Sequence, residues 1–138
     1  MGIIYNETKK DLPCEQLQKM FVAVGWSDNS ETPDMIKKYN VPFINSTIVV
    51  SAWDGDKLIG AIRALSDKMF RSIIHDFLVL PEYQNQGIGK ELMRRCIAFY
   101  PNSEWLVGTS KETAPYYEKL GFEMNDGAFL FIKCKHFG

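Results

Sequence analysis

The segment between residues 70 and 109 restricts the possible folds of this chain more than any other stretch. Phe70–Leu80 is an apolar run that predicts a strand, and the polar, glycine-containing loop Glu82–Gly89 follows it. A helix then extends to about Tyr100, because apolar residues recur on one of its faces, at Ile88, Leu92, Met93, Cys96 and Ile97. Glu104–Thr109 predicts the next strand. A strand, a helix and a strand in this order predict a βαβ unit.

The residues before this unit predict an antiparallel meander. Thr47–Trp53 and Lys57–Leu65 are apolar runs on either side of Asp54-Gly55-Asp56, a sequence typical of a tight hairpin turn. Phe70–Leu80 follows a second turn and supplies the third strand of the meander.

Shorter elements are predicted at the two ends of the chain. Toward the N-terminus these are a strand at Ile3–Glu7, a helix at Pro13–Gly25 and a helix capped by Thr32 that extends to about Tyr39. Toward the C-terminus they are a helix at Thr113–Leu120 and a hairpin of Phe122–Met124 with Ala128–Lys133. The whole pattern predicts an α+β fold with a mixed, mainly antiparallel sheet of about seven strands, flanked by about four helices.

Composition argues against several classes of function. The chain has 138 residues, so residues 1–138 are expected to form a single domain. A formal net charge of −1, without a block of like charges, predicts no binding to nucleic acid or to an anionic membrane. Three scattered cysteines, two histidines and the lack of a long apolar run predict no disulfide framework, no metal site and no membrane span. With an N-terminus unlike a signal peptide, these features predict a cytoplasmic protein.

The glycine loop before the long helix is the candidate binding site. A helix N-terminus leaves backbone N–H groups unpaired and carries the positive end of the helix dipole, so it attracts phosphate oxygens. Gly87 and Gly89 lack a Cβ and let a ligand approach the backbone, and Lys90 adds a positive charge. The loop fails the Walker pattern, because Glu91 follows Lys90, and the dinucleotide pattern, because Leu92 replaces its third glycine. The remaining readings are another phosphate-bearing ligand and a tight turn without a ligand.

Two motifs in the chain resemble those of a known family. Gln84-x-x-Gly87-x-Gly89, preceded by Val79-x-Pro81 on a strand, is similar to the acetyl-CoA signature of the GNAT superfamily of N-acetyltransferases. Residues 114–122, APYYEKLGF, resemble the late helix of that family, and the order of the predicted elements also agrees. One departure is Ser110, which stands near the place where many members have an asparagine that touches the cofactor.

The resemblance implies an acetyl-CoA-dependent N-acetyltransferase that uses no metal, with a central splayed βαβ cofactor cleft. Loop N–H groups would bind the pyrophosphate of the cofactor, and the pantetheine arm would follow the end of the signature strand. An N–H group near Val79 would polarise the thioester carbonyl. The implied cofactor-binding residues are Phe77, Leu78, Val79, Leu80, Gln84, Asn85, Gln86, Gly87, Ile88, Gly89, Lys90, Ser110 and Tyr117.

The resemblance also implies two catalytic residues. Tyr117 matches the position that protonates the leaving thiolate, and His75 lies where several members carry a base for the acceptor amine. A primary amine has a pKa of about 10.4 and must lose a proton before it attacks. The alternatives are that Tyr117, like Tyr116, only packs in the core and that His75 is structural. Strand alternation predicts that Asp76 points to the face opposite His75 and is structural.

The acceptor is expected to be a small primary amine such as an arylalkylamine or a polyamine. The residues expected to border its site are Trp26, Met35, Phe43, Arg63, Asp67 and Phe70, and those expected to hold a cationic amine are Glu31, Asp34 and Asp67. The signature strand and loop contain no cysteine, which favours direct attack in a ternary complex over an acyl-enzyme. A non-catalytic acyl-CoA-binding or sensing module and a protein N-terminal or lysine acetyltransferase stay open. Dimers are frequent in the family, so a homodimer is also open.

Overall fold

The computed structural model describes residues 2–127 and 129–136, and the chain divides into two compact units, residues 1–107 and residues 108–138. The first unit contains the sheet and most of the helices, and the second contains α5 (Ala114–Lys119). The single domain expected over residues 1–138 stays a prediction. Within the described part of the chain, no helix is both long enough and apolar enough to cross a membrane.

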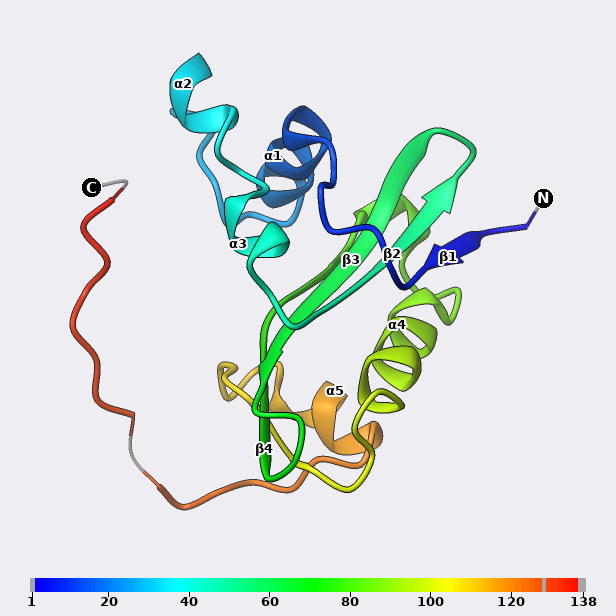
Figure 1. Ribbon diagram of the computed structural model, residues 1–138, viewed down its shortest axis with the longest axis vertical. Helices are drawn as coiled ribbons and strands as arrows, with labels where there is room; N and C mark the ends of the chain where they lie inside the picture. Colours follow the sequence, from blue (N-terminus) through cyan, green and yellow to red (C-terminus); the bar gives the residue numbers. More distant parts are fainter. Residues whose placement is uncertain (1, 128, 137–138) are drawn as a thin grey trace. The chain divides into compact units, whose positions relative to one another are not determined.

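The first unit is built on a five-stranded sheet in the order β1-β2-β3-β4-β5 (Figure 1). The strands β1 to β4 are antiparallel to their neighbours, and β5 runs parallel to β4. Their bounds are β1 (Ile4–Asn6), β2 (Ile48–Asp54), β3 (Lys57–Ser66), β4 (Arg71–Val79) and β5 (Glu104–Val107). The predicted meander and βαβ unit are therefore confirmed.

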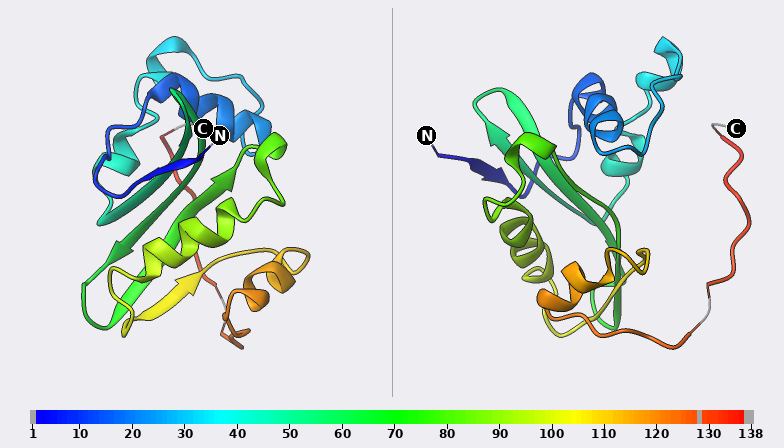
Figure 2. Two further views of the ribbon diagram at one scale, coloured as in Figure 1. Left: turned by 90° about the vertical axis from the view of Figure 1, so that its right-hand side faces the viewer. Right: turned by 180° about the vertical axis from the view of Figure 1, so that it is seen from behind.

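Helices lie on both faces of this sheet. α1 (Cys14–Ala23) and α3 (Val41–Ile44) lie on one side, and α4 (Ile88–Ile97) lies on the other (Figure 2). α2 (Pro33–Ile36) begins at the predicted cap, since the Met35 N–H donates a hydrogen bond of 3.3 Å to Thr32 Oγ1. The sequence did not predict α3, because four residues are too few for a periodic apolar pattern to be visible.

The core of the first unit lies between the sheet and the two longer helices. Leu17 and Met20 of α1 and Leu92 and Cys96 of α4 are almost fully buried. The other large buried aliphatic side chains come mainly from the hairpin of β2 and β3, at Ile48, Val49, Val50, Leu58, Ile59 and Ile62. Because each such side chain contributes roughly 1.5–3 kcal/mol when it is buried, the strands next to β4 form a stable support for the site.

The predicted C-terminal hairpin is wrong in the part that the structure describes. Neither Phe122–Met124 nor residues 129–133 form a strand, and Ala128 lies outside the described residues. The turn between them forms locally, since the Gly127 N–H donates a hydrogen bond of 2.6 Å to Asn125 Oδ1. A two-stranded hairpin has little stability unless it packs on something else, and residues 129–132 are 80–93% exposed. The described residues therefore contain five strands instead of the larger number predicted.

Candidate active site

β4 continues past the end of its pairing with β5. The parallel ladder in the described residues ends at Ile74 opposite Val107, so His75–Val79 extends beyond it. On its other edge β4 pairs with β3, and the ladder reaches Leu80, whose N–H donates a hydrogen bond of 2.9 Å to the Ile59 carbonyl. Alternation in an antiparallel pair directs the backbone groups of Val79, the preceding residue, away from β3. This is the strand end to which the resemblance assigns the pantetheine arm.

Side chains of the signature shape the loop that follows β4. Gln84 Nε2 donates a hydrogen bond of 3.0 Å to the Val79 carbonyl, and Gln86 Nε2 donates one of 3.3 Å to a carbonyl earlier in the loop. Asn85 has a φ of 63° and Gly87 a φ of 82°, both in the left-handed region. Glycine and asparagine adopt this region more readily than other residues. The signature residues therefore form the turn that leads from β4 into α4.

The N-terminus of α4 is the candidate phosphate site. Gly87 is the N-cap residue and no described side chain caps the helix, while Ile88 is buried and anchors its first turn. Gly89 and Lys90 follow in that turn, and Lys90 is exposed. The first N–H groups of this ten-residue helix are thus left without a side-chain acceptor, beside the positive end of the dipole. Such an arrangement suits the oxygens of a pyrophosphate.

A tyrosine that sequence reasoning missed ties this loop to the β2–β3 hairpin. Tyr83 lies in the 3-10 helix η1 (Pro81–Tyr83), and its hydroxyl donates a hydrogen bond of 2.6 Å to Asp54 Oδ2. The Lys57 ammonium lies 5.5 Å from the centre of the Tyr83 ring and 3.8 Å from a carboxylate oxygen of Glu82. The loop is therefore fixed at its start as well as at the helix that follows it.

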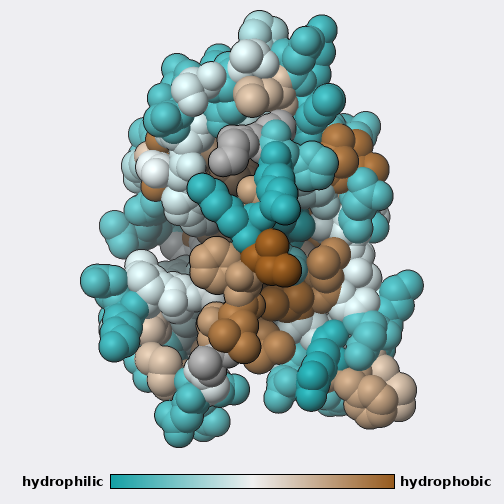
Figure 3. Space-filling view, turned by 90° about the vertical axis from the view of Figure 1, so that its left-hand side faces the viewer, coloured by the Kyte–Doolittle hydropathy of each residue, from teal (hydrophilic) through white to brown (hydrophobic). Residues whose placement is uncertain are grey.

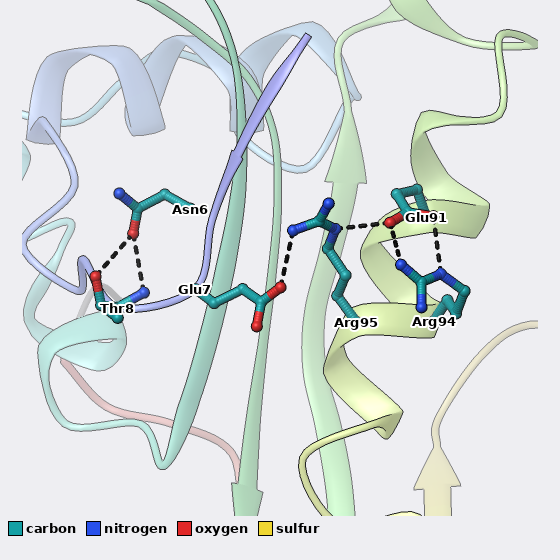
Figure 4. A network of polar contacts seen from close by, with 6 residues as sticks. All are labelled: Asn6, Glu7, Thr8, Glu91, Arg94 and Arg95. Atoms are coloured by element: carbon teal, nitrogen blue, oxygen red, sulfur yellow. Dashed lines mark hydrogen bonds and ion pairs between the residues drawn. The ribbon is translucent and has the colours of Figure 1, made fainter.

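A network of charges joins α4 to the residue that follows β1 (Figure 4). Arg95 donates hydrogen bonds of 2.6 Å to Glu91 and 2.8 Å to Glu7, and Arg94 donates one of 2.5 Å to Glu91. The Arg95 guanidinium also lies 4.6 Å from the centre of the Tyr5 ring. Hydrogen bonds from Arg94 and Arg95 lower the pKa of Glu91 to about 2. These two arginines pair with the Glu91 carboxylate and so reduce its repulsion of an anion at the start of α4.

His75 occupies a β-bulge. Arg63 of β3 pairs with Asp76 and its neighbour Ala64 pairs with Ile74, so His75 is an extra residue between two partners. The bulge interrupts the alternation of side chains along β4, so the prediction that Asp76 points to the face opposite His75 loses its basis. The Asp76 side chain pairs with the neighbouring strand, where its Oδ2 lies 2.5 Å from Arg63 Nε. Burial and the charge of Arg63 lower the pKa of His75, and Asp76 partly offsets them. The exposed imidazole is therefore mostly neutral at pH 7 and able to accept a proton.

Tyr117 and Ser110 belong to the second unit. The Tyr117 ring meets Tyr116 and Phe122 edge to face, with ring centres 5.5 Å and 5.9 Å away. Burial raises the pKa of Tyr117, so the phenol stays protonated at neutral pH, as a proton donor requires. Ser110 Oγ lies 2.9 Å from Thr113 Oγ1, next to the start of α5. The first unit thus places His75 on the strand that leads into the loop, while the cofactor contacts of Tyr117 and Ser110 stay predictions.

Two of the three carboxylates predicted to hold the amine are engaged in holding loops. Glu31 accepts hydrogen bonds from Tyr39, Ser27 and Gln18, and the bond from Tyr39 contributes most to lowering the pKa of Glu31 to about 2. Asp67 Oδ1 accepts three backbone N–H groups of the β3–β4 turn, at 2.7 to 3.0 Å. The third, Asp34, is exposed in the first turn of α2.

The residues predicted to border the acceptor do not form one cluster. Phe43 is buried beneath Arg63, whose guanidinium lies 5.6 Å from the centre of the ring, and Met35 contributes to the cap of α2. Trp26, after α1, is 54% exposed. Phe70 is 69% exposed, but it lies in the β3–β4 turn, at the opposite end of β4 from the loop. Figure 3 shows hydrophobic surface, in brown, on one face of the molecule.

These elements and this loop match a known domain. The family model described as the acetyltransferase (GNAT) domain matches residues 17–137. The chain belongs to the GNAT family. The resemblance drawn from the two motifs is confirmed, and this GNAT chain is an N-acetyltransferase.

Individual relatives of this GNAT chain are moderately similar to it. An uncharacterized N-acetyltransferase of Pyropia yezoensis, ycf52, is 29% identical over 126 residues, which cover 86% of this chain and 70% of the relative. A histone acetyltransferase of Glycine max is 32% identical over 124 residues, which cover 82% of this chain and 53% of the relative. The GNAT chain therefore spans about half the length of the second relative.

Solved structures share the fold of this GNAT chain. A GNAT family acetyltransferase from Streptococcus pneumoniae has a TM-score of 0.76 at 25% identity, over 97% of this chain and 100% of the other. An aminoglycoside 6′-N-acetyltransferase solved with coenzyme A has a TM-score of 0.69 at 17% identity, over 86% of this chain and 83% of the other. A GNAT fold supports acetyl-CoA binding. Among the described residues, no group of three or more His, Cys, Asp or Glu side chains could hold a metal ion.

Proposed function

We propose that this GNAT chain transfers the acetyl group of acetyl-CoA directly to a primary amine in a ternary complex. The observation that carries the proposal is the N-terminus of α4, which is capped by the left-handed Gly87 and by no described side chain. It follows the part of β4 that extends beyond β5, His75–Val79. If the pyrophosphate of acetyl-CoA binds at this helix end, its pantetheine arm can extend along β4 toward His75.

In the proposed reaction His75 accepts a proton from the acceptor ammonium, directly or through water. The freed amine lone pair attacks the thioester carbonyl carbon, and a backbone N–H near Val79 stabilises the negative charge that develops on the carbonyl oxygen. The C–S bond then breaks, and the Tyr117 phenol protonates the departing thiolate. The second proton of the acylated nitrogen returns to the Tyr117 phenolate through water, and His75 releases its proton to solvent. The lowered pKa of His75 and the raised pKa of Tyr117 support these roles, because each group starts in the form its step needs.

The cysteines of the chain support direct attack over an acyl-enzyme. Cys96 lies on α4 and is buried, and burial raises the pKa of its thiol to about 12, far from that of a reactive nucleophile. Cys14 lies on α1, where its thiol donates to the Lys37 carbonyl at 3.4 Å. Cys134 is exposed in the second unit. None of these residues belongs to β4 or to the loop.

For the acceptor we propose a small amine, an arylalkylamine before a polyamine. Trp26 offers an exposed aromatic ring, packed edge to face on Phe21, which in turn packs on Tyr39. The Tyr39 hydroxyl donates a hydrogen bond to Glu31, and the low pKa of Glu31 keeps this carboxylate ionised. An aromatic surface and a negative charge therefore belong to the same part of the chain, residues 21–39. The names of the relatives indicate the competing candidates, a lysine in a protein and an aminoglycoside. A cytoplasmic location and a homodimer are also proposals.

The experiment that tests the proposal is turnover of acetyl-CoA with an arylalkylamine, spermidine, an aminoglycoside and a histone-tail peptide. Products are measured by mass spectrometry, because a thiol-reactive dye would also label the exposed Cys134. The proposal predicts the highest kcat/KM for one of the first two acceptors. A higher value for the peptide or the aminoglycoside would assign that acceptor class instead. Binding of acetyl-CoA without any turnover would favour the sensing module.

A further inference from the structure

The bulge that carries His75 lies beside an ion pair that the proposed mechanism does not use. Arg63 and Asp76 are on adjacent strands, and their side chains are only 17% and 18% exposed. We propose that this pair positions His75 and controls its charge, so that Arg63 and Asp76 are positioning residues for the acetyl transfer. The inference rests on the proposed function, in which His75 is the base.

Arg63 is held from three directions. Its Nε lies 2.5 Å from Asp76 Oδ2, its Nη1 donates to Ser46 Oγ at 3.3 Å, and its guanidinium stacks 5.6 Å from the centre of the Phe43 ring. Ser46 is itself 3% exposed, and its hydroxyl donates a hydrogen bond of 2.7 Å to the Pro42 carbonyl. Because Phe43 of α3 and Ser46, two residues after that helix, hold the guanidinium, the guanidinium in turn fixes the carboxylate of Asp76.

The bulge transmits this order to His75. A bulge residue has no partner of its own in the ladder, so its backbone is held through the residues on either side. Ile74 on one side is buried in the core, and Asp76 on the other is held by Arg63. An anchored Asp76 therefore restricts the directions that the imidazole can take.

The same pair acts on the charge of the imidazole with opposite signs. Among the described residues, Arg63 on β3 and Asp76 on β4 are the charged groups that shift the His75 pKa, the first downward and the second upward. Loss of Arg63 alone removes a repelling cation and uncovers a carboxylate, so the imidazole should hold its proton to higher pH. Loss of the Asp76 charge alone should have the opposite effect. Shifts of opposite sign would therefore show that the charges of the pair reach the imidazole, and the pH profile of kcat/KM shows whether they affect turnover.

The test compares Arg63→Met and Asp76→Asn by NMR titration of the His75 ring and by the pH profile of kcat/KM. We expect the ring midpoint to rise by about half a pH unit in Arg63→Met and to fall in Asp76→Asn, and the acidic limb of kcat/KM to move with it. Arg71→Met is the matched control, because Arg71 lies on β4, as His75 does, and makes an exposed ion pair of 3.7 Å with Glu104 of β5. His136 serves as an internal reference in the titration.

The outcomes separate this inference from the proposed function. A His75 midpoint that stays in place in both folded variants would overturn the inference. A midpoint that moves while the kcat/KM limb stays would keep the coupling and remove His75 from the role of base. If Arg63→Met does not fold, Asp76→Asn tests the charge effect and Arg63→Lys the positioning. Arg63→Lys should keep the midpoint within about 0.3 unit but lower kcat several-fold, since lysine lacks the planar fork; an unchanged kcat would contradict positioning.

Discussion

The hydroxyl of Tyr83 donates a hydrogen bond of 2.6 Å to Oδ2 of Asp54, across 29 positions of sequence. Tyr83 ends the 3-10 helix at the start of the cofactor loop, and Asp54 ends β2. The bond therefore joins the part of the loop nearest β4 to the hairpin of β2 and β3. A loop held at this end presents the α4 N-terminus in one geometry, which lowers the entropy that a ligand must remove on binding.

Tyr83→Phe should weaken acetyl-CoA binding several-fold and reduce stability by about 1 kcal/mol or less. The ring and its contact with Lys57 remain, so only the tether to Asp54 is lost. Calorimetric titration gives the Kd, and urea unfolding gives the stability. Tyr100→Phe removes a hydroxyl after the other end of α4 and serves as the control. A Kd equal to that of the original chain would show that the tether does not organise the loop.

Gly87→Ala and Gly25→Ala form a matched pair. Their φ values are 82° and 85°, and a Cβ at either position would meet nothing within 4 Å. Each substitution should therefore cost about 1–2 kcal/mol through left-handed backbone strain. Only Gly87→Ala should also reduce the rise in Tm caused by acetyl-CoA, because the strain distorts the cap of α4. Equal ligand-induced shifts in the two variants would remove Gly87 from the binding site.

Tyr117→Phe should lower kcat by about 100-fold and change the Kd of acetyl-CoA only a few-fold. The ring keeps its packing on Tyr116 and Phe122, so only the protonated hydroxyl is lost. An interaction made only in the transition state affects turnover and leaves binding intact. Steady-state kinetics and thermal shifts give the two quantities, with Tyr116→Phe as the control. Full activity in Tyr117→Phe would make the residue a packing aromatic.

His75→Gln should remove an acidic limb from the pH profile of kcat/KM. The folded chain lowers the His75 pKa from 6.5, chiefly by burial, so the limb has its midpoint below that value. A base works in its deprotonated form, and activity therefore rises with pH through this midpoint. The loss in His75→Gln should be larger at pH 7 than at pH 9, where more of the amine is already neutral. His136→Gln is the control, and a limb that persists in His75→Gln would assign the base elsewhere.

Trp26→Ala should raise the KM for an arylalkylamine about ten-fold and leave the KM for spermidine nearly unchanged, because only the first acceptor has a ring to stack. Trp26 is 54% exposed, so its removal should cost little stability. Phe70→Ala removes a similarly exposed aromatic ring at the far end of β4 and serves as the control. Parallel losses for both acceptors would argue against recognition of an aryl group by Trp26.

Much of the site could be predicted because its signals are local. The cap at Thr32, the Asp54-Gly55 turn and the amphipathic face of α4 each depend on residues within a few positions of one another. The signature loop belongs to this class, since Gly87 and Asn85 adopt left-handed conformations that their own residue types allow. The family model then confirms the N-acetyltransferase identity inferred from two short motifs.

What the sequence by itself determined was the class of elements, their order and the chemistry of the loop, because hydrophobic period and backbone preference act over short distances. Only the tertiary structure decided that His75 lies in a bulge, that Arg63 meets Asp76 and that Glu31 is engaged by Tyr39. These relationships depend on strand register and on side chains brought together from distant positions. A shift of one residue in register changes every cross-strand partner and leaves the sequence unaltered.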